Sequence, residues 1–254
     1  MLTPGPRRPL RAALLVVVLA LLLAPAHLRP ASAATDGKLV LVLDSSGSME
    51  DKIDGGTKIA VAKRALNRVV DHLPGDAQVG LRVYGARVDD ENDPAACTDS
   101  ELVVPIGPAD KPALKAQIAR YRPLGETPIS YSLKQAAQDL GGSGRRTVVL
   151  VSDGRESCGE DPCVTAANLA KQGIDLKLDV IGLAVSGATR SQLQCIADRG
   201  RGTYADAKNA KQIEDSLDQL ATRAFRPFQL TGTPVEGSED AATATEVRPG
   251  QYLD

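Results

Sequence analysis

Two short apolar runs, far apart in the chain, each end at an aspartate. Leu39–Leu43 leads directly into Asp44, and Thr147–Val151 leads into Ser152 and Asp153. Such runs are typical of strands buried on both faces, as in a parallel sheet covered by helices. The carboxyl ends of parallel strands lie at one edge of a sheet, and ligands of open α/β sheets bind beyond that edge. We therefore expect the two aspartates to lie over one crevice.

The rest of the chain alternates between patterns typical of amphipathic helices and of strands. The expected helices cover 59–73, 112–121, 128–140, 162–172, 189–199 and 208–224, and the further strands cover 77–84, 101–106, 175–185 and 203–207. This alternation predicts an α/β fold with a doubly wound, mostly parallel central sheet and helices on both faces. Because no helix separates 77–84 from 101–106, the second of these is expected to be an antiparallel edge strand.

The N-terminal residues 1–33 have the layout of a secretory signal peptide. Three arginines among the first 11 residues precede an apolar run over 12–24, and Ala31-Ser32-Ala33 offers small residues for cleavage near Ala33-Ala34. The run is shorter than the ~20 residues of a membrane-spanning helix, which favours a cleaved signal peptide over the alternative of a retained anchor. We expect a mature chain without a membrane span that is secreted, extracellular or in the cell envelope.

One domain over 36–225 is expected to carry the fold. Residues 226–254 are rich in Thr, Ala, Gly, Pro and Glu without a sustained period, which predicts a linker, a tail or the start of a further domain. The chain of 254 residues has a formal net charge of −2 and no basic stripe with interleaved aromatic residues. Nothing in this composition indicates a nucleic-acid partner.

Four cysteines follow the predicted signal peptide, namely Cys97, Cys158, Cys163 and Cys195. An even number of cysteines in an exported protein favours disulfide bonds. A zinc site is the alternative, but the chain has no C-x-x-C pair, and His72 is the one histidine after the signal peptide.

The loop after the first apolar run has the pattern D-x-S-x-S, formed by Asp44, Ser46 and Ser48. Alternate residues of a tight turn can direct their side chains to one point, and Gly47 allows the backbone to bend there. A site lined by oxygens with few formal charges suits a hard cation such as Mg²⁺. The alternative is that these residues only cap a turn through local hydrogen bonds.

The segment "DSSGSM", Asp44–Met49, resembles the metal-ion-dependent adhesion site (MIDAS) of von Willebrand factor type A domains. The resemblance extends to "GETPIS", where Thr127 matches the threonine of the motif, and to "VSDG", where Asp153 matches its second aspartate. It covers about Lys38–Ala224 and includes the order of the elements. Thr127 is also suited to be the N-cap of its helix, and Asp153-Gly154 to be an ordinary turn.

The resemblance implies a metal site in which Ser46 and Ser48 bind the ion through their hydroxyls. Thr127 would bind directly or through water, and Asp44 and Asp153 would act mainly through metal-bound water and hydrogen bonds. Mg²⁺ is the expected ion, with Mn²⁺ or Ca²⁺ as alternatives. Because neutral hydroxyls leave the ion most of its charge, a Glu or Asp carboxylate of a partner protein is expected at an open coordination position.

The expected function is therefore an exported, adhesion-type protein-interaction module and not an enzyme. The alternative is a metal-assisted hydrolase on the same scaffold. Hydrolysis usually requires an activated water with a base or a second ion, and no such group is predicted near the strand ends. An acidic stretch at Asp89, Asp90, Glu91 and Asp93 is expected to be a solvated loop and not a second metal site.

The cysteine pairing is expected from the placement of the loops. Cys97 and Cys158 lie on loops predicted near the metal face, whereas Cys163 begins one helix and Cys195 lies on the next. This favours Cys97–Cys158 and Cys163–Cys195, with a short Cys158–Cys163 loop as the alternative.

Overall fold

The computed structural model describes residues 37–173, 175–225, 233–235 and 251–253. The predicted signal peptide, 1–33, lies outside the described residues, as does most of the predicted tail. Within that tail the structure has two three-residue strands, β9 (Thr233–Val235) and β10 (Gln251–Leu253), which pair in parallel. The sequence pattern did not predict them. No helix of the described residues is both long and apolar enough to span a bilayer.

A six-stranded sheet forms the centre of the domain, and its strand order is β5-β4-β1-β6-β7-β8. The strands are β1 (Gly37–Asp44), β4 (Gln78–Tyr84), β5 (Ser100–Pro108), β6 (Arg145–Ser152), β7 (Leu176–Leu183) and β8 (Tyr204–Ala207). All neighbouring pairs are parallel except β4 and β5, which are antiparallel. The predicted α/β class, the mostly parallel sheet and the antiparallel edge strand are thus confirmed.

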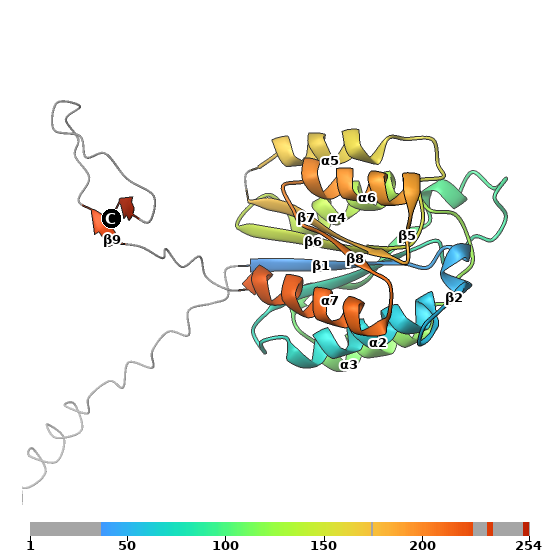
Figure 1. The fold of residues 1–254 in the computed structure, drawn as a ribbon, viewed down its shortest axis with the longest axis horizontal. Helices are drawn as coiled ribbons and strands as arrows, with labels where there is room; N and C mark the ends of the chain where they lie inside the picture. Colours follow the sequence, from blue (N-terminus) through green and yellow to red (C-terminus); the bar gives the residue numbers. More distant parts are fainter. Residues whose placement is uncertain (1–36, 174, 226–232, 236–250, 254) are drawn as a thin grey trace, which may run out of the picture. The chain divides into compact units, whose positions relative to one another are not determined.

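Helices cover both faces of this sheet (Figure 1). One face carries α2 (Lys58–His72), α3 (Lys111–Arg120) and α7 (Ala210–Phe225), and the other carries α4 (Ile129–Leu140), α5 (Pro162–Lys171) and α6 (Gly187–Arg199). The side chains of β1 alternate between two apolar cores: Leu39, Leu41 and Leu43 belong to the first, Val40 and Val42 to the second. This burial on both faces explains why β1 has no polar residue between Lys38 and Asp44.

The observed ends of the elements differ from the predicted ends by a few residues. The strand predicted over 175–185 is Leu176–Leu183, and the helix predicted over 208–224 is Ala210–Phe225. A small antiparallel hairpin of β2 (Lys52–Ile53) and β3 (Gly56–Thr57) precedes α2 and was not predicted, because two-residue strands carry no periodicity. Gly55 in its turn and Gly56 at the start of β3 have φ of 98° and 127°, a backbone conformation that favours glycine.

Candidate metal centre

Asp44 ends β1 in a fully buried hydrogen-bond network. Its Oδ1 accepts hydrogen bonds from the backbone N–H of Ser46 at 2.8 Å and from Ser46 Oγ at 2.6 Å. Its Oδ2 accepts from Ser152 Oγ at 2.6 Å, and Ser152 Oγ in turn accepts from the hydroxyl of Tyr84 at 3.1 Å. Both carboxylate oxygens therefore have protein donors, and the carboxylate determines the orientation of the Ser46 side chain.

Two hydroxyls lie between Asp44 and the second aspartate, Asp153. Ser48 belongs to the short 3-10 helix η1 (Gly47–Glu50), which places its Oγ 3.4 Å from Ser46 Oγ. Ser48 Oγ donates to Asp153 Oδ1 at 2.8 Å, across 105 positions of sequence. The polar side chains thus form a continuous series at the carboxyl edge of β1 and β6, from Asp44 through Ser46 and Ser48 to Asp153.

Thr127 reaches the same place from a third loop. That loop is held against the β1 loop because the backbone N–H of Gly47 donates to the carbonyl of Gly125 at 3.0 Å. A Cβ placed on Gly154 would lie 3.3 Å from Thr127 Oγ1 and 3.7 Å from Ser48 Oγ. Both hydroxyl oxygens therefore lie close to Gly154, which has no side chain to fill the space beside them.

The charges of this cluster favour a cation. Burial, followed by the negative charge of Asp153, raises the pKa of Asp44 to about 6. A nearby positive charge would stabilise the ionised form of this carboxyl group. The five residues proposed from the sequence, Asp44, Ser46, Ser48, Thr127 and Asp153, thus lie together and offer only oxygen donors, which fits a hard divalent cation.

Lys58 supplies one positive charge to the cluster. This first residue of α2 places its Nζ 2.7 Å from Asp153 Oδ2 and 3.0 Å from Asp51 Oδ2. The Lys58 side chain is 12% exposed and that of Asp153 is 0% exposed, so their ion pair is largely shielded from water. Burial lowers the pKa of Lys58, but hydrogen bonds and charge contacts with Asp153 and Asp51 outweigh burial and raise it above its ordinary value.

Sequence patterns did not identify Lys58, Tyr84 or Ser152 as parts of this cluster. Lys58 stands at the start of an amphipathic helix, where a lysine is commonly solvated. Of these three residues, Ser152 could have been found from the sequence, because it directly precedes Asp153 at the end of a buried strand. Among the residues that the structure describes, no group of three or more His, Cys, Asp or Glu side chains could hold a metal ion. A metal at the cluster would thus need its hydroxyls.

The remaining candidate residues lie outside the cluster. The acidic stretch that includes Asp89 and Glu91 is exposed, as expected for a solvated loop. His72 is exposed at the end of α2, where its Nδ1 lies 3.0 Å from Asp218 Oδ1. The structure pairs Cys97 with Cys158 and Cys163 with Cys195, with Cα–Cα distances of 5.4 and 5.6 Å. This is the pairing favoured from the loop placement.

Comparisons with known proteins agree with this fold. The family model described as von Willebrand factor type A domain matches residues 39–156. YwmC of Bacillus subtilis (strain 168), described as an uncharacterized protein, is 30% identical over 192 residues, which cover 74% of this chain and 84% of YwmC. YwmD of the same strain, also described as uncharacterized, is 26% identical over 193 residues, which cover 74% of this chain and 86% of YwmD.

Solved structures with the same fold include BatB from Bacteroides thetaiotaomicron, with a TM-score of 0.60, 20% identity, and coverage of 74% of this chain and 98% of BatB. The pilus adhesin SpaC from Lactobacillus rhamnosus GG has a TM-score of 0.60 and 16% identity, covering 74% of this chain and 30% of SpaC. Proximal thread matrix protein 1 of the mussel byssus, with a zinc-occupied MIDAS motif, has a TM-score of 0.56 and 17% identity, covering 75% of this chain and 47% of its own.

Fold and cluster together define a helix-covered α/β sheet domain with a polar site at the carboxyl edge of its parallel strands. The chain belongs to the von Willebrand factor type A domain family.

Proposed function

We propose that this domain is an exported, metal-dependent protein-interaction module and not an enzyme. In this proposal Ser46, Ser48 and Thr127 hold a divalent cation, with Mg²⁺ as the expected ion. Asp44 and Asp153 orient those hydroxyls and hold metal-bound water. A bound ion would supply a positive centre that attracts a carboxylate from a partner protein.

The observation that carries the proposal is the series of hydrogen bonds between the two aspartates. Asp44 Oδ1 accepts from Ser46 Oγ at 2.6 Å, and Asp153 Oδ1 accepts from Ser48 Oγ at 2.8 Å. Each carboxylate therefore orients one hydroxyl, so that its neutral oxygen is positioned for an ion. Because the first donors are neutral, the ion keeps charge for a partner, whereas a shell of carboxylates would neutralise it.

Two proteins with the same fold support the proposal. The solved mussel byssus protein has a MIDAS motif occupied by zinc, and SpaC is a pilus adhesin. The two disulfide bonds of this chain also support an oxidising, extracytoplasmic location. The partner's acidic residue is inferred from the charge that hydroxyl donors leave on the ion.

Thermal unfolding with and without divalent ions tests the metal site. Purified protein is stripped with EDTA, dialysed, and melted in Mg²⁺, Mn²⁺ or buffer alone. A ligand at 100 times its dissociation constant stabilises the folded state by about 2.7 kcal/mol, so the melting temperature is expected to rise with ion concentration. The Asp153→Ala variant is expected to lose this rise, and an unchanged wild-type melting temperature would overturn the metal site.

Partner capture tests the interaction itself. Protein immobilised in Mg²⁺ is exposed to proteins from the extracellular surface, and bound material is eluted with EDTA. The proposal expects a partner that is released by EDTA and is not retained by Asp153→Ala. Capture that is insensitive to both would argue against binding through the metal. Phosphatase or esterase turnover that is lost in the same variant would favour the hydrolase.

A further inference from the structure

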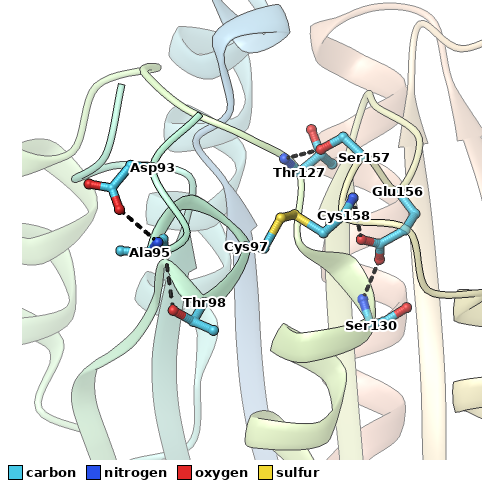
Figure 2. The surroundings of a disulfide bond; sticks show 9 residues. All are labelled: Asp93, Ala95, Cys97, Thr98, Thr127, Ser130, Glu156, Ser157 and Cys158. Carbon is cyan, nitrogen blue, oxygen red and sulfur yellow. Dashed lines mark hydrogen bonds between the residues drawn. A yellow bond between two sulfur atoms is a disulfide. The ribbon is translucent and has the colours of Figure 1, made fainter. Parts of the chain in front are cut away.

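We propose that Ser157 is a positioning residue for Thr127, and that the Cys97–Cys158 disulfide holds Ser157 in the position where it does so. This inference rests on the proposed function, since it concerns how one donor of the same metal site is held in place. Figure 2 shows the residues involved.

Ser157 forms hydrogen bonds with both the N–H and the carbonyl of Thr127. Its Oγ accepts a hydrogen bond from the Thr127 N–H at 2.8 Å, and its own N–H donates to the Thr127 carbonyl at 3.3 Å. Thr127 is 7% exposed and has no regular secondary structure of its own, because α4 begins only at Ile129. The Thr127 carbonyl also accepts from the N–H of Ile129 at 2.9 Å, but the acceptor of the Thr127 N–H is Ser157, 30 positions away in sequence.

Glu156 fixes the same segment to the start of α4. Pro128 occupies the N-cap position of α4 and makes no side-chain cap hydrogen bond. Instead, Glu156 Oε2 accepts from the N–H of Ser130 at 2.6 Å, and Glu156 Oε1 accepts from the N–H of Cys158 at 3.0 Å (Figure 2). A carboxylate here satisfies a free donor of the first helical turn and interacts favourably with the positive end of the helix dipole.

The disulfide connects this segment to a second anchored loop. Residues 153–160 contain no helix or strand, so their position depends on individual contacts and not on a regular backbone ladder. Cys97 lies in the short 3-10 helix η2 (Ala96–Thr98), directly before β5, and Thr98 Oγ1 donates to the Ala95 carbonyl at 3.2 Å (Figure 2). The Cys97–Cys158 bond thereby fixes the residue after Ser157 to the edge of the sheet.

These contacts make a metal donor depend on residues that do not touch the ion. Groups that hydrogen-bond to metal ligands commonly change metal affinity 10–100-fold when they are removed. Loss of the Ser157 hydroxyl leaves the Thr127 N–H without its protein acceptor, so that Thr127 Oγ1 is no longer held beside Ser48. Removal of the hydroxyl is therefore expected to lower the metal affinity but to change the stability of the fold only weakly, because Ser157 is exposed.

The test is the dissociation constant for Mg²⁺, measured by isothermal titration calorimetry on the oxidised full-length mature protein. Ser157→Ala is expected to raise it about tenfold. Ser157→Thr keeps the hydroxyl and is expected to restore binding close to that of the wild type. Melting in EDTA checks that each variant folds, and it is expected to differ little between Ser157→Ala and the wild type.

The second disulfide provides a matched control. A Cys97→Ser/Cys158→Ser double variant is expected to weaken Mg²⁺ binding, whereas Cys163→Ser/Cys195→Ser removes a bond between α5 and α6 and is expected to leave binding near the wild-type value. If wild-type protein binds Mg²⁺ and Ser157→Ala binds it equally well, the inference is overturned while the proposed function stands. If wild-type protein binds neither Mg²⁺ nor Mn²⁺, the proposed function itself is overturned.

Discussion

Replacing Lys58 by methionine tests whether the Lys58 ammonium competes with the proposed cation for Asp153. In the structure, the Lys58 ammonium lies 2.7 Å from Asp153 Oδ2 in a nearly dry environment. A divalent cation at the proposed site would be attracted by the same carboxylate and repelled by the ammonium. Methionine keeps most of the length and apolar volume of the lysine side chain, so the substitution removes mainly the charge.

The geometry gives the expected magnitudes. Removing one partner of a buried ion pair typically destabilises a protein by about 3–5 kcal/mol, because the other charge is left buried and unpaired. Since 12% of the Lys58 side chain is exposed, we expect the lower end for Lys58→Met in EDTA, about 3 kcal/mol. Loss of the repulsion is expected to raise the Mg²⁺ affinity about tenfold, which is about 1.4 kcal/mol.

Urea unfolding in EDTA and in saturating Mg²⁺ measures both quantities. The variant is expected to lose stability in EDTA and to regain much of it in Mg²⁺, so that its metal-dependent stabilisation exceeds that of the wild type. Lys134→Met is the matched control. Lys134 pairs with Glu160 at the surface, where the two side chains are 43% and 50% exposed, and such pairs contribute less than about 1 kcal/mol.

Two results would refute this reasoning. A Lys58→Met variant that is no less stable in EDTA than Lys134→Met would show that the Lys58–Asp153 pair carries little energy. A variant that binds Mg²⁺ more weakly than the wild type would show that Lys58 supports the ion, for example by orienting Asp153, and does not compete with it.

Three further predictions concern other parts of the described domain. Gly154→Ala is expected to reduce the Mg²⁺-dependent rise in melting temperature, because its Cβ would lie 3.2 Å from Thr127 Cγ2 and displace Thr127 slightly; an unaltered rise would contradict this expectation. The Cys97→Ser/Cys158→Ser variant, with a sequence separation of 61, is expected to lose about 4 kcal/mol of unfolding free energy in urea by loop-closure entropy; a loss near zero would contradict this estimate. Burial raises the pKa of Asp179 above its ordinary value. The free energy of unfolding is therefore expected to fall as the pH rises through the pKa that Asp179 has in the unfolded chain. Asp179→Asn is therefore expected to melt higher than the wild type at pH 7 and to match it near pH 3, whereas an equal difference at both pH values would exclude the carboxylate as the cause.

The predicted strands and helices were recovered because their signals are local. β1 is continuous and apolar since both of its faces are buried, and α5 begins where Asp161 accepts hydrogen bonds from the N–H groups of Cys163 and Val164 ahead of the first turn. Short elements such as the β2–β3 hairpin were missed because two-residue strands leave no pattern. The exact ends of helices were also missed, since capping depends on geometry that the pattern does not contain.

The candidate site was predictable as a set of residues but not as a structure. Asp44, Ser46 and Ser48 are close in sequence, so their joint role follows from the spacing of one loop. Asp153 could be added because it follows the second buried strand, whereas Thr127 could be added only because its motif resembles that of a known family.

The sequence by itself determined the class of the fold, the edge of the sheet where polar side chains gather, and the oxygen donors available there. Only the tertiary structure decided which charges and hydrogen bonds surround those donors. Lys58 meets Asp153 across 95 positions because β1 and β6 are neighbours in the sheet, so that the loops at their ends share one edge. Ser157 reaches Thr127 because the segment after β6 lies beside the start of α4. Periodicity reports which face of an element is buried, but it does not report which distant element covers that face, and the site is built from those distant contacts.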